Sequence, residues 1–259
     1  MPSFNDKVAL VSGGARGIGA AVARLISHGG GKVVIADLPG SSGELTATEL
    51  NCDFEALDVT NEAAWTHVVA QVEARHGGID ILVNAAGIVG DVLNGALDRM
   101  AFADWRRVMS VNLDGTFLGC REVMRVMKKA GRGSIVNLSS VASYYPTTQN
   151  AAYGASKGGV TQLSKTVALF GSQGGDRIRC NSVHPGQIAT QMLHDIRAQR
   201  LQRGAQAGTP QGPSSVDRIP LGEGTPEEAA NLIAFLASDE ASYITGAEFT
   251  VDGGWRLLR

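Results

Sequence analysis

Two side chains with complementary acid–base chemistry, Tyr153 and Lys157, lie four residues apart in the sequence. Residues at this spacing share one face of a helix, so the phenol and the ammonium group are expected to be neighbours. A free tyrosine has a pKa of about 10, and a nearby positive charge favours the phenolate and lowers that pKa. A phenol tuned toward neutrality can take a proton from an alcohol or return one to a carbonyl. This pair therefore predicts an acid–base site.

A second chemical feature is the glycine-rich segment 11–19 (VSGGARGIG), which joins a buried apolar run to a helical pattern. Gly13 lets the chain turn, Gly17 brings the backbone close to a pyrophosphate, and Gly19 lets helix and strand pack tightly. The helix N-terminus offers unpaired N–H groups and the positive end of its dipole to an anion. A tight turn alone would also explain the glycines, but Asp37 at the end of the next apolar run favours a dinucleotide site.

The position of Asp37 also bears on which dinucleotide would bind. A carboxylate there accepts hydrogen bonds from both adenosine ribose hydroxyls and repels a 2′-phosphate, which favours NAD over NADP. The alternative is a simple turn residue ahead of Pro39. Arg16 beside the phosphate loop could assist a 2′-phosphate, but the residue after Asp37 is Leu38, which carries no charge. The sequence predicts NAD.

Short β-branched runs alternate with longer helical patterns along the chain, and they are the elements that must position these groups. We expect seven strands at residues 7–11, 32–36, 54–57, 79–83, 134–138, 177–183 and 248–251. Helical patterns include residues 18–27 and 108–127, and Thr225 with Glu228 forms a capping box before a further helix. Continuous apolar strands separated by helices predict an α/β fold: one domain over residues 1–259 with a doubly wound, Rossmann-type parallel sheet.

Composition excludes several classes of function. The 259 residues are 44% hydrophobic and 19% charged, with a formal net charge of −2, so no general basic field exists for nucleic acid or anionic lipid. No apolar run approaches the roughly 18 residues that a membrane span needs. The three cysteines are far apart and form no Cys-x-x-Cys pair, so neither a disulfide framework nor a metal site is predicted. The first residues do not resemble a secretory leader, and we expect a reducing, cytoplasmic setting.

The spacing of Gly13, Gly17 and Gly19, together with the segment 84–87 (NAAG) and Tyr153-x-x-x-Lys157, resembles the short-chain dehydrogenase/reductase family. The resemblance continues through Asn112, Ser140, 184–186 (HPG), 244–246 (ITG) and 251–254 (VDGG), and so covers nearly the whole chain.

The resemblance implies four catalytic residues. Tyr153 would be the general acid/base, Lys157 would tune it and hold the nicotinamide ribose, and Ser140 would position the substrate oxygen. Asn112 would maintain a proton relay through a water linked to the lysine. Without the resemblance, Asn112 is equally well interpreted as a helix-interior amide bonded to the backbone.

The resemblance also implies a cofactor-binding set, in which Asp58 would bond the adenine amino group and the segment 185–190 would hold the nicotinamide carboxamide. This set is Ser12, Gly13, Arg16, Gly17, Ile18, Gly19, Asp37, Leu38, Asp58, Val59, Asn84, Ala85, Gly87, Tyr153, Lys157, Pro185, Gly186, Ile188 and Thr190. Two members depart from the family pattern: Ser12 replaces the usual threonine, and Ala85 replaces a second asparagine.

Residues 190–224 interrupt the alternation of strands and helices, and we interpret them as a substrate lid, with an irregular surface insertion as the alternative. Apolar side chains at the start of this stretch, with Tyr144, Tyr145 and Pro146, suit an apolar or cyclic, steroid- or terpene-like alcohol, although simple packing would explain them too. The predicted substrate contacts are Ser140, Tyr145, Gln149 and Met192.

These observations predict an NAD-dependent alcohol dehydrogenase/ketone reductase acting on a small molecule. Three alternatives are an NADPH-dependent 3-oxoacyl-carrier reductase, which Asp37 opposes, a non-catalytic dinucleotide-binding sensor or assembly protein, and a hydrolase built on the G-x-S-x-G pattern at 154–158. The four catalytic residues oppose the sensor, and the lack of a strand before Ser156 opposes the hydrolase. The resemblance further implies a homotetramer paired through the helices around residues 104–128 and 150–170.

Overall fold

The computed structural model describes residues 2–206 and 219–258, and its centre is a sheet of seven strands. The strands are β1 (Val8–Ser12), β2 (Lys32–Asp37), β3 (Asp53–Ala56), β4 (Ile81–Asn84), β5 (Arg132–Leu138), β6 (Arg177–Pro185) and β7 (Glu248–Val251). All neighbouring pairs are parallel, in the order β3-β2-β1-β4-β5-β6-β7. The predicted fold class is therefore confirmed, with strand ends within about three residues of those expected.

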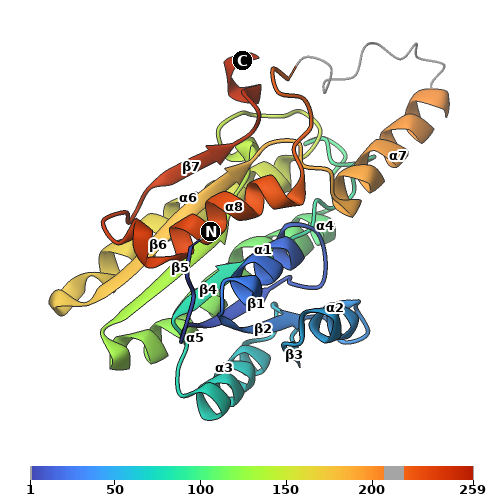
Figure 1. The fold of residues 1–259 in the computed structure, drawn as a ribbon. Helices are drawn as coiled ribbons and strands as arrows, with labels where there is room; N and C mark the ends of the chain where they lie inside the picture. Colours follow the sequence, from blue (N-terminus) through green and yellow to red (C-terminus); the bar gives the residue numbers. More distant parts are fainter. Residues whose placement is uncertain (1, 207–218, 259) are drawn as a thin grey trace.

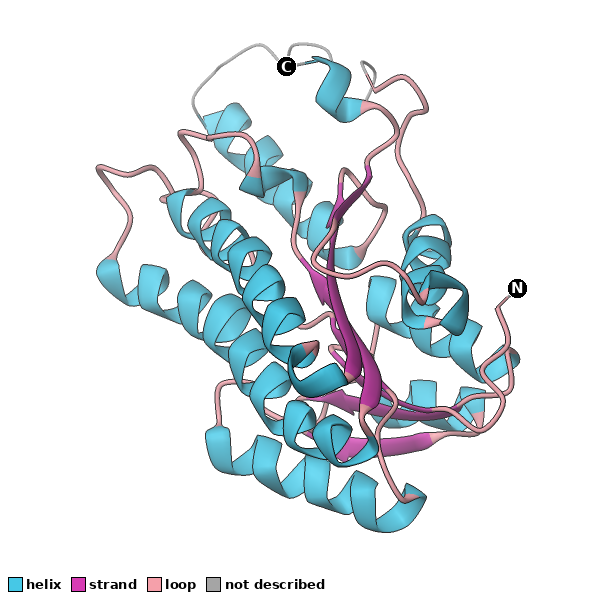
Figure 2. Ribbon diagram, turned by 90° about the vertical axis from the view of Figure 1, so that its left-hand side faces the viewer, coloured by secondary structure: helices cyan, strands magenta, loops and turns pink. Residues whose placement is uncertain are grey.

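Helices cover both faces of the sheet, as Figure 2 shows with the strands lying between two helical layers. The helices are α1 (Gly17–His28), α2 (Gly43–Leu50), α3 (Glu62–His76), α4 (Phe102–Met109), α5 (Gly115–Ala130), α6 (Ala151–Gly171), α7 (Gln191–Gln206) and α8 (Pro226–Ala237) (Figure 1). None of the helices in the described ranges is both long and apolar enough to cross a membrane.

The central strands are buried on both faces because successive side chains point into two different cores. In β1, Val8 and Leu10 join the core formed with α3, α5 and α6, whereas Ala9 and Val11 join the core formed with α1 and α8. Trp65 is fully buried in the first core, where its indole N–H donates to the carbonyl of Val59 at 3.0 Å. This two-sided burial explains the continuous apolar runs in the sequence.

Two helical regions differ from the predicted pattern. Residues 108–127 do not form one regular helix, because a π-helical segment, Ser110–Asp114, separates α4 from α5. The first half of the predicted lid is the regular helix α7. Residues 207–218 lie outside the described residues, and the description resumes at Ile219. The capping box before α8 is confirmed, with Thr225 and Glu228 bonded reciprocally.

The strand order reverses between β1 and β4, since the chain runs outward from β1 to β3 and then returns to the other side. The helices that follow β1 and β4 leave toward opposite faces, which opens a crevice at the carboxyl ends of these strands. Ligands of open α/β sheets bind at such a switch point. The ligand-binding site is therefore expected in this crevice at the carboxyl ends of β1 and β4.

Candidate active site

A large cleft of about 1380 Å³ lies at the carboxyl edge of the sheet, along the ends of β1, β2, β4, β5 and β6. This volume exceeds the roughly 300–1,000 Å³ that holds one drug-sized ligand. Most of the predicted site residues line it, namely Gly13, Arg16, Gly17, Ile18, Gly19, Asp37, Leu38, Asp58, Val59, Ala85, Gly87, Ser140, Tyr145, Tyr153, Lys157, Pro185, Gly186, Ile188, Thr190 and Met192. The cleft has room for a cofactor beside a substrate.

The glycine loop at one end of the cleft has no space for side chains. Gly13 and Gly17 have φ values of 71° and 57°, in the left-handed region that favours glycine. A methyl group on Gly13 would collide with the backbone of Ala86, and one on Gly19 would collide with the carbonyl of Gly13. The close packing brings the N-terminus of α1 to the cleft, where its unpaired N–H groups can hold a phosphate.

Asp37 connects the glycine loop to the end of β2. Its Oδ2 accepts a hydrogen bond from the backbone N–H of Ala15 at 2.9 Å, and its Oδ1 accepts from Leu38 at 2.8 Å. An ionised carboxylate has about four acceptor positions, so two remain for ribose hydroxyls. Asp58 lies across the same end of the cleft, exposed, with Oδ1 held by the backbone and hydroxyl of Thr60.

Ser12 and Asn84, which the resemblance assigned to cofactor binding, do not line the cleft. They are paired in the ladder between β1 and β4, and both are buried. The Ser12 hydroxyl donates to Asn84 Oδ1 at 3.3 Å, and Asn84 Nδ2 donates to Asn137 Oδ1 at 2.9 Å. The two side chains belong to a polar network inside the sheet, and their hydrogen-bonding groups are directed away from the cleft.

Tyr153 and Lys157 lie in the first two turns of α6 and both face the cleft. Asn150, which sequence reasoning missed, caps this helix: its Oδ1 accepts from the backbone N–H of Tyr153 at 3.2 Å, and its Nδ2 donates to the carbonyl of Val89 at 3.0 Å. Asparagine is a preferred N-cap residue, so the signal was present in the sequence. The cap fixes where the helix begins and hence where Tyr153 points.

Lys157 is 4% exposed, and its ammonium group donates to the carbonyl of Leu138 at 2.7 Å. Burial lowers the pKa of Lys157 from 10.5 to about 8, because the charged form loses its hydration. Nζ lies 5.8 Å from the centroid of the Tyr153 ring. Since one of three ammonium N–H groups is used by Leu138, two remain for groups in the cleft.

The pKa of Tyr153 differs from the expected direction. Burial raises it, while a side-chain hydrogen bond with Ser140 works in the opposite sense. The charge of Lys157 is not among the causes of the shift; its ammonium group donates to the Leu138 carbonyl and lies 5.8 Å from the centroid of the Tyr153 ring. At neutral pH the phenol is therefore protonated and can donate to an oxygen in the cleft.

Asn112 occupies the centre of the π-helical segment Ser110–Asp114 and is fully buried. Its Oδ1 accepts from the backbone N–H of Ile88 at 2.8 Å, and its Nδ2 donates to the Ile88 carbonyl at 2.9 Å and to the Ser156 hydroxyl at 3.0 Å. The side chain thus binds backbone, as the resemblance-free interpretation expects, and it does not line the cleft. It ties the loop after β4 to α6.

The hydrolase alternative is not supported by the geometry. Ser156 lies within α6 rather than at a strand-to-helix turn, and it is fully buried. Its hydroxyl donates to the carbonyl of Tyr153 at 2.8 Å. A nucleophile elbow requires an exposed serine at a sharp turn after a strand, so the G-x-S-x-G pattern is coincidental here.

Aromatic residues close the far end of the cleft. Tyr145 packs edge-on against Trp255, with ring centroids 5.3 Å apart, and its hydroxyl donates to the carbonyl of Arg256 at 3.3 Å. Trp255 lines the cleft, but its sequence context near the C-terminus gave no sign of this. Gln149 is exposed and does not line the cleft, so the structure gives no support to its predicted substrate contact.

The helix α7 contributes apolar side chains to the same end. Met192, Leu193 and Ile196 line the cleft, and each is partly buried. Arg197 of α7 binds Glu223 with Nη1 to Oε1 and Oε2 distances of 3.0 Å, which connects this helix to the segment that precedes α8. Within its described part, the segment predicted as a lid is therefore a helix that lines this end of the cleft.

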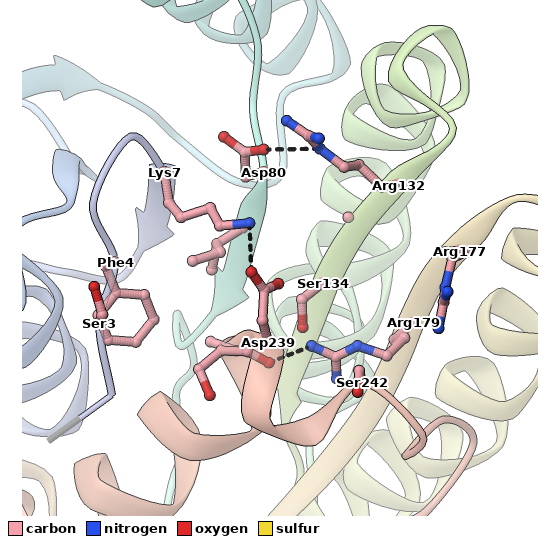
Figure 3. Close-up of a pocket in the computed structure, with 14 residues that line it drawn as sticks. Ser3, Phe4, Lys7, Asp80, Arg132, Ser134, Arg177, Arg179, Asp239 and Ser242 are labelled. Atoms are coloured by element: carbon pink, nitrogen blue, oxygen red, sulfur yellow. Dashed lines mark hydrogen bonds and ion pairs between the residues drawn. The ribbon is translucent and has the colours of Figure 1, made fainter.

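A smaller cavity of about 370 Å³ lies at the opposite, amino edge of the sheet (Figure 3). Its cations are Lys7, Arg132, Arg177 and Arg179. Lys7 pairs with Asp239 at 2.9 Å, and Arg179 donates to the carbonyls of Leu236 and Ser238 at 2.8 Å each. These carbonyls lie at the C-terminus of α8, so Arg179 caps this helix. The contacts of Lys7 and Arg179 in the cavity are therefore explained by a role in stabilising the fold.

Comparisons with known proteins cover nearly the whole chain. A model of the family described as enoyl-(acyl carrier protein) reductase matches residues 13–256. The chain is 43% identical over 251 residues to a 3-alpha-(or 20-beta)-hydroxysteroid dehydrogenase of Mycobacterium tuberculosis (strain CDC 1551 / Oshkosh), covering 96% of this chain and 88% of that protein.

A second relative is trans-4-hydroxycyclohexanecarboxylate dehydrogenase of Sinomonas cyclohexanicum, which is 40% identical over 261 residues, covering 96% of this chain and 92% of that protein. Among solved structures, levodione reductase is similar with a TM-score of 0.90 at 29% identity, covering 99% of this chain and 100% of that one. The matched proteins thus share both the fold and the extent of this chain.

Proposed function

This chain belongs to the short-chain dehydrogenase/reductase family, and from that premise we propose that it is an NAD-dependent dehydrogenase of cyclic secondary alcohols. Members of the family use nicotinamide dinucleotides. The relatives whose names describe hydroxysteroid and hydroxycyclohexane oxidation support a secondary-alcohol oxidoreductase. The choice of NAD, the substrate class and the residue roles are our proposal.

The observation that carries the proposal is the meeting of three groups in one cleft. Tyr153 and Ser140 both line the cleft, close enough for the serine side chain to act on the pKa of the phenol, and the buried Lys157 lies beside the tyrosine ring with two N–H groups to spare. The Ser140 hydroxyl accepts from the backbone N–H of Ala142 at 3.1 Å, so its own proton is available. A substrate oxygen could therefore contact a phenol and a hydroxyl together.

The residues present fit a dinucleotide. The glycine loop leaves no room for a side chain at Gly13 or Gly19, and the free N–H groups at the start of α1 suit a pyrophosphate. Asp37 has two acceptor positions left for ribose hydroxyls, and its negative charge disfavours a 2′-phosphate. This charge is our reason for proposing NAD, and for ranking a carrier-linked, NADPH-dependent reductase second.

In the proposed mechanism the nicotinamide, when bound, supplies the acceptor or donor of the hydride at the carbinol carbon. Tyr153 donates its proton to the carbonyl oxygen during reduction and takes the alcohol proton during oxidation. Ser140 donates a hydrogen bond to the same oxygen and stabilises the charge that develops there. Lys157 carries a positive charge near this site and can bind a hydroxyl of the cofactor, and Asn112 holds α6 against the loop after β4.

An apolar ring is the substrate shape that the cleft suits. Tyr145 and Trp255 offer aromatic edges and faces, and Met192 and Ile196 offer flexible apolar surface from α7. Ligand sites of this kind are mostly apolar, with a few polar groups that set orientation. The polar groups here lie at the end occupied by Ser140 and Tyr153.

Exposed apolar side chains on the helices support a homo-oligomer, which we propose to be a tetramer. Phe102 of α4, Phe117 of α5, and Leu169 and Phe170 of α6 are between 45% and 74% exposed. Where exposed apolar side chains gather on one face, they mark protein interfaces. The three free cysteines suit the reducing cytoplasm that we propose as the setting.

The test is the appearance of absorbance at 340 nm when the protein is mixed with NAD⁺ and a panel of cyclic secondary alcohols. We expect turnover with hydroxysteroids or substituted cyclohexanols, and kcat/KM at least tenfold higher with NAD⁺ than with NADP⁺. Tighter binding of NADPH than of NADH would overturn the cofactor assignment. Binding of NADH without turnover on any alcohol or ketone would favour the non-catalytic alternative.

A further inference from the structure

His184 lies next to the last residue of β6, directly behind the turn that carries Ser140, and its side chain is fully buried. It is part of no group that the proposed function uses. Its Nδ1 lies 3.2 Å from the carbonyl oxygen of Ser140 and 3.0 Å from the hydroxyl of Ser143. Its Nε2 lies 2.9 Å from the hydroxyl of Ser182.

These contacts determine which ring nitrogen carries the proton. A carbonyl oxygen can only accept, so the short distance to Ser140 requires a hydrogen on Nδ1. The Ser143 hydroxyl donates to the same carbonyl at 2.7 Å, which leaves its oxygen free to accept from the ring. Ser182 then donates to Nε2. Burial agrees with this arrangement, since it lowers the pKa of His184 to about 4 and keeps the ring neutral.

The turn after β5 has few other links to the strands beneath it. The register of β5 with β6 ends at Leu138, and Ser139 just after it donates its N–H to the carbonyl of Val183 at 2.8 Å. Ser140 then starts a short 3₁₀ turn, Val141–Ser143. The His184 ring holds this turn by the Nδ1 contacts and by stacking on Tyr144, with ring centroids 4.5 Å apart and an interplanar angle of 22°.

Tyr144 is itself anchored. Its phenol lies near the carboxylate of Glu248 of β7, which raises the pKa of Tyr144 and pairs with Lys165 at 2.6 Å, and the guanidinium of Arg256 lies 4.3 Å above its ring. The ring of His184, which projects from β6, therefore packs against an aromatic ring that is itself held in place. A side chain held in this way transmits its position to the backbone of Ser140.

We propose that His184 is a positioning residue: by donating from Nδ1 to the Ser140 carbonyl, it holds the Ser140 hydroxyl where it meets the Tyr153 phenol. His184 touches no reacting atom. Its hydrogen-bond partners are the Ser140 carbonyl and the hydroxyls of Ser143 and Ser182. The proposal rests on the proposed function for its catalytic consequence, but its geometric part does not.

The test compares two variants of nearly equal shape, His184→Asn and His184→Leu. The asparagine amide nitrogen occupies about the place of Nδ1 and can donate to Ser140, whereas leucine cannot. We expect kcat for alcohol oxidation to fall at least about tenfold in His184→Leu and to stay within about threefold of the unaltered protein in His184→Asn. The dissociation constant of NADH should agree within about threefold between the two variants, because the adjoining cofactor residues Pro185 and Gly186 are the same in both.

Equal kcat in the two variants, whether high or low, would overturn the proposal. A third variant, His184→Gln, places its amide nitrogen near Nε2 and should behave like His184→Leu; it serves as the polar alternative if leucine prevents folding. Crystal structures give a readout that needs no turnover: the Ser140–Tyr153 hydrogen bond should persist in His184→Asn and be lost in His184→Leu or His184→Gln. If the unaltered protein proves inactive, the proposed function fails, and these structures alone decide the role of His184.

Discussion

The two edges of the sheet use buried cations in opposite ways. At the amino edge, Arg179 donates to three carbonyls, those of Leu236, Ser238 and Ile244, which end α8 and the segment before β7. At the carboxyl edge, Lys157 has one acceptor, the Leu138 carbonyl, among the described residues, and it faces the cleft. A buried cation that holds several parts of the backbone together stabilises the fold, whereas one that faces a cleft with donors to spare is available to a ligand. The difference separates the structural edge from the reactive one.

The carboxyl edge gathers more groups with pKa values shifted by burial than the amino edge. Burial shifts the pKa values of Tyr153, Lys157 and His184, all at the carboxyl edge, against their charged forms. At the amino edge, burial lowers the pKa of Arg179 while the charge of Asp239 acts in the opposite direction, and Lys7 pairs with the same Asp239. Clusters of desolvated groups in a cleft are characteristic of functional sites.

The largest effect is expected from Tyr153→Phe, which removes one oxygen from the reactive edge. Turnover should fall by about 10³-fold, since general acid–base catalysis contributes roughly 10²–10⁴-fold. NADH affinity should stay within about threefold, as measured by fluorescence titration. Residual turnover above a tenth of the original would remove Tyr153 from the mechanism.

At the amino edge, Arg179→Met should lower stability and leave turnover nearly unchanged. Three hydrogen bonds from a charged donor are lost, so the free energy of unfolding should fall by about 2–3 kcal/mol in urea denaturation. The carbonyls themselves keep a second donor each, from Ser134, Asn181 and Ala241. The kcat of the folded protein should remain within twofold. The control is Arg177→Met on the same strand, an exposed position where a change within about 0.5 kcal/mol is expected. A large loss of kcat in Arg179→Met, with normal stability, would erase the distinction between the edges.

A pH dependence of stability should originate at the reactive edge. The folded pKa of His184 is about 4, while an unperturbed histidine has a pKa of about 6.5, so the unfolded chain binds more protons between these values. Stability should therefore fall as the pH drops through this window. From pH 7 to pH 5, His184 should account for about 2 kcal/mol of the loss in the free energy of unfolding.

The comparison that isolates this contribution is the same pair of denaturation curves for His184→Leu. That variant should lose about 2 kcal/mol less between the two pH values, since leucine binds no proton. Glu248, Lys157 and Arg256 also face this ring, but they are unchanged in the variant. Parallel losses in the two proteins would show that the ring is already protonated, or exposed, at pH 5.

The smallest effect is expected at the cofactor end of the cleft. Asp37→Ala should reduce the preference for NADH over NADPH by about tenfold, or about 1.4 kcal/mol, because the repulsive charge is removed. Asp37→Asn is the matched control: it keeps one acceptor for the backbone N–H groups of Ala15 and Leu38 without the charge. Preference that shifts in Ala but not in Asn would assign the effect to loop structure rather than charge.

Much of the architecture follows from the sequence, because it depends on local patterns. The seven apolar runs, the glycine loop and the Thr225 capping box each lie within a few residues, and the structure contains all of them. The strand β7 begins and ends at the residues predicted for it, 248 and 251, so a run of four residues was enough to place this strand. The helix α7 was not expected, since its apolar positions are sparse among glutamines and arginines.

The features that the sequence did not reveal depend on distant contacts. The π-helical segment is fixed by bonds from Asn112 to Ile88 and Ser156, and Trp255 reaches the cleft by packing on Tyr145. Ser12 and Asn84 point into the sheet because of their place in the ladder. The pKa of Tyr153 depends on burial, which cannot be obtained from the spacing of Tyr153 and Lys157.

The central claim, that a buried phenol exchanges the substrate proton, is tested most directly by the pH profile of kcat/KM for the oxidation of a cyclic alcohol. Burial raises the pKa of Tyr153, so only the small phenolate fraction can accept the proton at neutral pH. The rate should therefore rise with pH by about tenfold per unit until the phenol ionises. A profile that is flat from pH 6 to pH 10, in a protein shown to remain folded, would contradict the account.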